Sequence, residues 1–349
     1  MTSTTMQRGM SLVELLVALV VALLVSLAAT GGAMVFTASQ RQGVGTGGAA
    51  ISASTALAVL RDDVAAAGLG FFGDSQFLCS RLNLSVDTTV LLDNAEFTPV
   101  EVTAEGSNSR IDVVYATEVS SGTNVLLNAP AAAASAALRS LLPVNVGQAV
   151  LLAPDTPGVA PCTVRTITAN TAATFDKAQL IEYGNQSTAR FNRAAFTVNP
   201  TYPDKGRVTL LGDLRWSRYR LDGTDLVLQR PLGGADVVLA RNVMALRAEY
   251  GLADEGKTAL AAWQVASGAS WAALDPARLA RVRALRVGIV TRSTQPEKPN
   301  SAGECEATPV LPQLFGDDIT PDVADWKCYR FRTAVAVVPL RNLVMGTAK

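Results

Sequence analysis

One long apolar stretch dominates the start of the chain. No charged side chain occurs from Leu15 to Gln40, and Leu, Val and Ala make up most of the residues from Leu15 to Ala29. As a helix at about 1.5 Å per residue, the uncharged stretch would be about 39 Å long, which exceeds the apolar thickness of a bilayer. The pattern therefore predicts a helix that lies in a membrane at some stage.

Glycines interrupt the helical pattern beyond this stretch. Four of them stand between Gly43 and Gly48, and each weakens a helix by about 1 kcal/mol relative to alanine. We therefore expect a joint here. The helical pattern resumes over residues 51–67 and stops at Gly68–Gly70, because glycine commonly ends helices. The apolar residues of the resumed helix share one face: Ile51, Leu57, Leu60 and Val64.

From Phe71 onward the apolar residues alternate in short runs bounded by turn residues, which predicts β-strands. The clearest hairpin joins residues 215–221 to 226–230 through the turn Asp222-Gly223. Asp275-Pro276 has the residue types of a helix N-cap and first helical position. The other strands are predicted over residues 111–115, 149–152, 163–168, 242–250, 282–291 and 329–337. The fold class is therefore α+β, with a long N-terminal hydrophobic helix packed on a globular domain of antiparallel β-sheet.

Two of these strands carry apolar side chains at alternate positions. Leu285, Val287 and Ile289 point to one side of the strand predicted over residues 282–291. Phe331, Thr333, Val335 and Val337 line one face of the last strand, together with Tyr329. Alternation of this kind is typical of strands with one buried face.

Charge and composition exclude several classes of protein. Lys plus Arg equals Asp plus Glu at 30 each, and no basic run occurs, so a nucleic-acid partner is not expected. The chain has no histidine, which removes histidine-based triads and zinc sites. No phosphate-binding G-x-x-x-x-G-K-[ST] motif occurs either. We expect no catalytic residues, no cofactor and no metal, and we interpret the acidic loop before the last strand as solvated.

Four cysteines are spread along the chain without a C-x-x-C pair. In an exported protein they would form up to two disulfides, and three pairings are possible. The four are Cys79, Cys162, Cys305 and Cys328.

Three interpretations of the N-terminus compete. It could be a simple signal anchor, a secretory signal cleaved near the small residues Ser26–Ala29, or a leader cut between Gly9 and Met10 that leaves the apolar helix on the mature protein. Glu14 distinguishes them, because a carboxylate in an apolar helix costs up to a few kcal/mol in a bilayer. Neither an anchor nor a secretory signal has a use for it, whereas a packed helical bundle could pair it with a cation.

The segment from Arg8 to Leu16 resembles the signature of type IV pilins and type II secretion pseudopilins. In that family a prepilin peptidase cuts after the glycine, here Gly9, and N-methylates the new first residue, here Met10. The resemblance implies that Glu14 pairs with the N-terminal amine of a neighbouring subunit. Met10 replaces the more frequent phenylalanine, and Gly31-Gly32 stands where many major pilins have a helix-breaking proline.

Further segments resemble PilW-type minor pilins and the related J-type pseudopilins. They comprise Arg61, Ala67-Gly68, Phe72-Gly73, the hairpin Tyr219–Arg230, Val290–Ser293 and Val338–Asn342. The chain departs from the family at Cys79, which lies several residues beyond Gly73 instead of directly after it. A disulfide often closes the C-terminal loop of pilins, so the resemblance favours Cys305–Cys328 and leaves Cys79–Cys162.

The resemblance implies four segments. They are a leader peptide at 1–9, a transmembrane and assembly helix at 10–40, a soluble continuation of that helix with a glycine joint at 41–70, and a β-rich pilin head at 71–349. The expected location is the inner membrane, crossed once with the C-terminal domain in the periplasm, and then the pilus fibre or its tip.

The expected function is that of a non-enzymatic minor pilin that primes or caps filament assembly. Implied partners are the prepilin peptidase, other minor and major pilins, the inner-membrane assembly platform and, as a further candidate, a tip adhesin. Two alternatives remain open: a minor pseudopilin of a type II secretion system, and a membrane-anchored periplasmic enzyme or binding domain.

Overall fold

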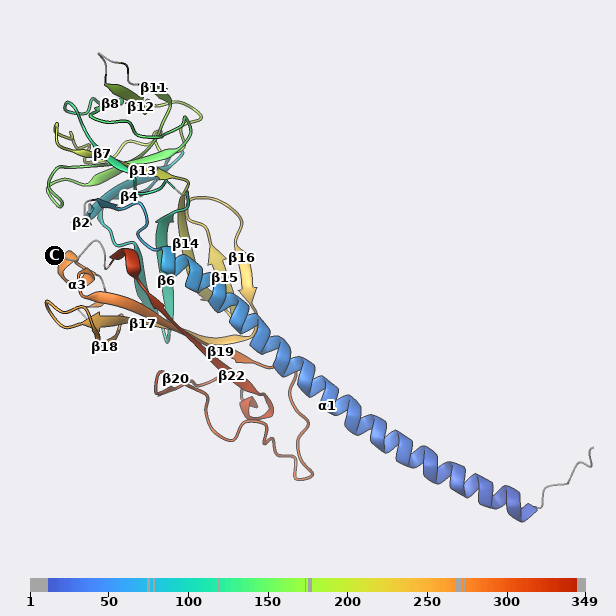
Figure 1. The fold of residues 1–349 in the computed structure, drawn as a ribbon. Helices are drawn as coiled ribbons and strands as arrows, with labels where there is room; N and C mark the ends of the chain where they lie inside the picture. The colour runs from blue at the N-terminus through green and yellow to red at the C-terminus, as the bar shows by residue number, and fades with distance from the viewer. Residues whose placement is uncertain are drawn as a thin grey trace, which may run out of the picture.

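The computed structural model describes residues 12–73, 76–77, 79–118, 120–172, 174, 178–267, 271–272 and 274–343. Gly9 and Met10, at the expected cleavage site, lie outside these residues. The structure consists of one long helix and a head built mainly of β-strands, which gives the α+β class expected from the sequence. Half of the helix packs on the head and the other half projects from it (Figure 1).

The long helix, α1, runs without interruption from Leu12 to Ala66. The joint expected between Gly43 and Gly48 is therefore wrong. Glycine disfavours a helix by raising its entropic cost, but it adopts helical backbone angles without strain. Added Cβ atoms at Gly47 and Gly48 would meet nothing within 4 Å, so these glycines satisfy no packing requirement inside the chain.

The helix ends where the glycines of its C-terminal turn predict. Gly68 and Gly70 both have positive φ, at +79° and +91°, and Cβ atoms there would lie within 3 Å of other side chains. One apolar face of the last turns is buried as expected, but Ile51 does not belong to it, because its side chain is 68% exposed. The buried residues of this part of the chain are Ala53, Ala56, Leu57, Leu60, Val64 and Ala67.

Two antiparallel sheets lie against α1 and form what we call the proximal lobe. The first has the strand order β16-β15-β14-β6-β5 and the second β18-β17-β19-β22. The bounds of the first are β5 Val100–Glu105, β6 Asn108–Ala116, β14 Leu214–Asp222, β15 Asp225–Gln229 and β16 Val237–Ala240. Those of the second are β17 Val243–Ala253, β18 Leu260–Val265, β19 Val282–Arg292 and β22 Phe331–Pro339.

Two further sheets form a distal lobe at the end of the head away from the projecting part of α1 (Figure 1). Their orders are β4-β3-β10-β9-β13-β7 and β11-β12-β8. The strands of the larger sheet are β3 Arg81–Val86, β4 Thr89–Glu96, β7 Asn124–Leu126, β9 Ala149–Ala153, β10 Cys162–Thr166 and β13 Arg207–Gly212. Those of the smaller are β8 Ser135–Leu138, β11 Ala169–Thr171 and β12 Gln179–Glu182. The β10–β3 pair is parallel, so the expectation of antiparallel sheet needs this one amendment among the described strands.

Short elements complete the head. They are β1 Phe72–Gly73, β2 Gln76–Phe77, α3 Pro276–Leu279, β20 Gln313–Leu314, β21 Asp317–Asp318 and the 3-10 turn η1 Trp326–Cys328. The predicted cap of α3 is confirmed, because Asp275 accepts a hydrogen bond from the backbone N–H of Arg278. The predicted hairpin is also confirmed as β14 and β15.

The buried cores divide roughly by lobe, but the core around Leu82 also includes Val114 and Ala116 of β6 and Leu214 of β14, where the first sheet meets the distal lobe. In the proximal lobe, the buried face of α1 packs against residues such as Leu246, Leu285 and Val287 from the second sheet. In the distal lobe, one core lies around Leu82, Leu151 and Val164, and another lies between the two sheets. The chain crosses from the proximal to the distal lobe after β6 and returns at β14.

Candidate assembly site

The first part of α1 has no covering from the head. The segment Leu12–Ala33 is long and apolar enough to cross a membrane, and none of it is buried inside the chain. Its hydroxyl groups are satisfied within the helix, since Ser26 donates to the carbonyl of Ala22 at 2.8 Å and Thr30 donates to the carbonyl of Ser26. An apolar surface of this length needs an apolar phase or other helices around it.

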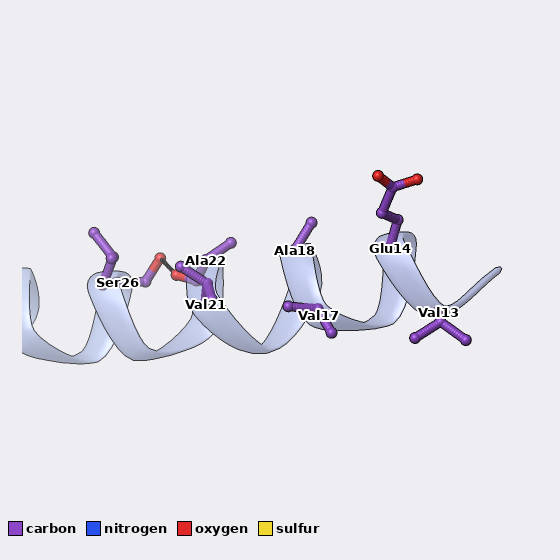
Figure 2. A pocket seen from close by; sticks show the side chains of 8 residues that line it. Val13, Glu14, Val17, Ala18, Val21, Ala22 and Ser26 are labelled. Atoms are coloured by element: carbon purple, nitrogen blue, oxygen red, sulfur yellow. Dashed lines mark hydrogen bonds between the residues drawn. The ribbon is translucent and has the colours of Figure 1, made fainter. Parts of the chain in front are cut away.

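Glu14 lies in the first turn of α1 and is the one charged residue of this segment. Figure 2 shows its carboxylate projecting from the same side of the helix as Ala18, with Val13 on the other side. The side chain is exposed, and the first turn of α1 belongs to the end of the helix that projects away from the head (Figure 1). It therefore stands on a surface that another helix could contact. Its expected partner is the N-terminal amine of a neighbouring subunit, and Met10, which would carry that amine, lies outside the described residues.

At its other end, α1 is fixed to the head by an acidic side chain. The hydroxyl of Tyr115 donates to Oδ1 of Asp63 at 2.5 Å, and the hydroxyl of Tyr219 donates to Oδ2 at 2.5 Å. The two tyrosines come from the neighbouring strands β6 and β14. Burial, followed by the carboxylate of Asp63, raises the pKa of Tyr115 to about 12, and both effects raise the pKa of Tyr219 further. Both phenols therefore stay protonated and able to donate at neutral pH.

The C-terminal turn of α1 is closed by groups from distant parts of the chain. The side-chain amide of Asn342 donates to the carbonyls of Ala66 at 3.3 Å and Ala67 at 3.2 Å. The backbone N–H of Gly68 donates to the carbonyl of Val114 at 2.9 Å. The Asn342 bonds satisfy carbonyls that the end of a helix leaves without partners, and they bind α1 to the segment after β22. The Gly68 bond ties the end of α1 to β6.

The structure contains two disulfides, Cys79–Cys162 and Cys305–Cys328, which is the pairing favoured from the sequence. The first joins the segment before β3 to β10 inside the distal lobe. The second joins the loop after β19 to η1, just before β22. Among the described residues, no group of three or more Cys, Asp or Glu side chains is gathered as metal ligands would be.

Sequence reasoning missed the part of the site that Asp63 forms. A signal for it was present, because Asp63 follows Ala56 and Leu60 at helical spacing and so stands on the buried face of α1. A carboxylate on such a face needs polar partners. Its partners could not be named, since they lie 52 and 156 residues further along the chain.

Comparison with known proteins agrees with the uncovered helix and its acidic residue. Residues 4–30 match the prokaryotic N-terminal methylation motif. The chain is thus a type IV pilin-like protein. Residues 226–342 match the family described as type IV pilus-assembly protein W, PilW. The protein is accordingly of the PilW type, and the matched region holds β16 and all four strands of the second sheet.

A solved type IV-like pilin from Thermus thermophilus is 12% identical to the chain. The match covers 84% of this chain and 97% of that one, with a TM-score of 0.33. No curated protein matches the chain.

The methylation motif and the PilW family together indicate the general role of the N-terminal helix. They imply processing by a prepilin peptidase and interaction with other pilins. The apolar helix and the motif fit a pilin anchored in the inner membrane with a soluble C-terminal domain. Pilin-like families are structural proteins, which agrees with a chain that lacks histidine.

Proposed function

We propose that this protein is a non-enzymatic minor pilin that primes or caps the assembly of a type IV pilus. The observation that carries the proposal is the single carboxylate of Glu14 on an otherwise apolar helix that the head leaves uncovered. A carboxylate in an apolar layer is stable only when it is neutralised or paired. A bundle of such helices supplies a cation if each subunit has a free amine at the same depth.

Maturation would create that amine. Cleavage between Gly9 and Met10 would remove a leader at 1–9 and leave an N-methylated Met10 four residues before Glu14. The amine of one subunit could then pair with Glu14 of its neighbour. The mature chain would comprise the assembly helix at 10–40, its soluble continuation at 41–70 and the head at 71–349.

The proposed setting follows from this division. The helix would cross the inner membrane with the head in the periplasm, and the subunit would later occupy the pilus fibre or its tip. Its partners would be the prepilin peptidase, minor and major pilins, the inner-membrane assembly platform and a tip adhesin. The hydrogen bonds from Tyr115 and Tyr219 to Asp63 support the proposal, because they would transmit to the head any force applied to α1.

Mass spectrometry of the N-terminus tests the maturation step. The expected result is a chain that begins at N-methyl-Met10. An uncleaved Met1, or a chain that begins near Ala29, would overturn the proposal, because the first describes a simple anchor and the second a secretory signal.

A pair of variants tests the role of Glu14 separately. Glu14→Gln keeps the shape of the side chain and removes its charge, so we expect the protein in the membrane at normal levels but absent from sheared pilus fractions and from complexes with other pilins. Ser26→Ala is the matched control in the same apolar segment, since the hydroxyl of Ser26 bonds only within its own helix among the described residues. Normal assembly of Glu14→Gln would contradict the proposed pairing.

A further inference from the structure

The distal lobe contains a cavity that takes no part in the contacts of α1. Its volume is about 290 Å³, and it lies between the ends of β9 and β10 and two loops around residues 131–133 and 199–202. Leu152, Thr163, Tyr183 and Tyr202 are buried and form its floor. Ala132, Ala133, Asn199 and Thr201 are exposed and form its rim, so the cavity opens to solvent.

One charged side chain lines this cavity. Arg165 is partly buried on β10, and its guanidinium lies over the ring of Phe196 at 5.5 Å from the ring centroid. Within the described part of the chain, Arg165 forms no ion pair and its side chain makes no hydrogen bond. Partial burial lowers the pKa of Arg165, and only the hydroxyl groups of Tyr202 and Tyr183 act against this.

The two tyrosines cannot serve as the counter-charge. The hydroxyl of Tyr202 lies 3.0 Å from the carbonyl of Pro161 and 2.7 Å from Oγ1 of Thr163. That of Tyr183 lies 3.0 Å from the carbonyl of Ala132 and 2.9 Å from the carbonyl of Ser135. Burial raises the pKa of both phenols, that of Tyr183 to about 12, so both are neutral at physiological pH. They hold the walls of the cavity in place, and the positive charge of Arg165 has no counter-charge among the residues that the structure describes.

We propose that this cavity binds a small organic monocarboxylate, with its carboxylate on the guanidinium of Arg165 and its short body against Leu152 and the loop at residues 131–133. The planar guanidinium presents two parallel N–H groups that match a carboxylate. A single positive charge suits a monoanion better than a doubly charged phosphate. The volume lies at the small end of ligand pockets, which favours a ligand of few atoms over a polymer.

Ligand-observed saturation-transfer NMR on the full chain in detergent tests the proposal. The probes are acetate, propionate and N-acetylalanine, each compared with its neutral amide: acetamide, propionamide and N-acetylalaninamide. We expect at least one carboxylate to bind at least ten-fold more tightly than its amide. If none of the three carboxylates binds to the folded protein, or if acid and amide bind equally, the proposal is overturned.

Two variants assign the binding to this cavity. Arg165→Gln removes the charge and is expected to weaken carboxylate binding at least ten-fold, while Arg165→Lys keeps part of it. Arg193→Gln is the control, because Arg193 lies in the same lobe but pairs with Asp87 at 3.4 Å on the surface. Circular dichroism shows whether each variant is folded. Undiminished binding by folded Arg165→Gln would place the carboxylate elsewhere and overturn the assignment.

Discussion

Tyr219 donates a hydrogen bond to the carboxylate of Asp63 over 2.5 Å, although 156 residues separate the two in the chain. The contact joins the last turns of α1 to the middle of the first sheet. Tyr115 occupies the second oxygen of the same carboxylate, so both oxygens of Asp63 are held by the head. The one acidic group on the buried face of α1 thereby fixes the rotation of the helix as well as its position.

Substitution of Asp63 should therefore destabilise the head. In Asp63→Asn one oxygen is replaced by an NH2 group that cannot accept a hydrogen bond, which leaves one buried phenol without an acceptor. We expect the free energy of unfolding to fall by about 1.5–3 kcal/mol. Urea unfolding followed by circular dichroism measures the change. Asp62→Asn is the matched control, because Asp62 is exposed and its substitution should alter the free energy of unfolding by less than about 0.5 kcal/mol. An equal loss in both variants would contradict a stabilising role for the hydrogen bonds to Asp63.

Stability should also fall in alkali, because of the same tyrosines. Below about pH 10, Tyr115 is protonated in both the folded and the unfolded chain. Between pH 10 and about 12 the unfolded chain loses this proton while the folded chain keeps it, so the free energy of unfolding decreases by about 1.4 kcal/mol per pH unit for this residue. Above about pH 12 the contribution of Tyr115 is fully lost.

Urea unfolding of the wild type and of Tyr115→Phe at pH 9, 10, 11 and 12 tests this dependence. The variant is less stable at pH 9 because it lacks the hydrogen bond to Asp63. Its stability should then fall less steeply with pH than that of the wild type. Parallel slopes for the two proteins would show that the hydroxyl of Tyr115 ionises at its ordinary pKa.

The local elements of the head could be predicted, but their neighbours could not. The turn predicted at Asp222-Gly223 lies at Gly223 and Thr224, one residue on, and joins β14 directly to β15, so local sequence suffices for this hairpin. The other neighbour of β14 is β6, which ends at Ala116, about a hundred residues earlier. No periodicity in either strand selects that partner, since pairing over such a distance depends on the packing of the whole sheet.

The last strand shows a related limit. Phe331, Val335 and Val337 share a face as predicted, yet Val335 and Val337 are about half exposed. Val338 on the other face is buried in the core beside α1, with Ala336 partly buried next to it. Both faces of β22 are apolar, and it lies at the edge of its sheet, so the alternation alone could not indicate which face is covered.

Substitutions at the glycines of α1 test whether the helix is continuous around residue 47, where the sequence predicted a joint. Gly47→Ala adds a Cβ that meets no other atom within 4 Å, so the substitution should stabilise the helix by about 1 kcal/mol. Hydrogen exchange of the amides around residue 47 should slow by about five-fold. Ala50→Gly, at an exposed position one turn later, should accelerate it by a similar factor. Faster exchange in Gly47→Ala would show that the helix opens here in solution.

The two disulfides should differ in their effect on stability. The residues of Cys79–Cys162 are 83 apart in the chain and those of Cys305–Cys328 are 23 apart. Restricting the unfolded chain gives about 4.5 kcal/mol for the longer loop and about 3.5 kcal/mol for the shorter. Double alanine variants, one for each pair, allow the comparison by urea unfolding.

Removing both cysteines of a pair leaves no reactive thiol, so the two variants are matched. The larger loss should follow removal of Cys79 and Cys162. Non-reducing peptide mapping of the wild type checks the pairing itself, and a peptide that links Cys79 to Cys305 would contradict it.

The placement of the distal lobe within the chain has a consequence for how this pilin can change. Most of the lobe, from β7 to β13, is inserted between β6 and β14, which are adjacent strands of one sheet. Entry and exit are therefore neighbours in space, and the insertion can grow, shrink or be exchanged without changing the order of any strand that contacts α1. What the subunit displays at its far end can therefore diversify, provided that β10 keeps its pairing with β3 and its disulfide to Cys79, while the strands that contact α1 stay unchanged.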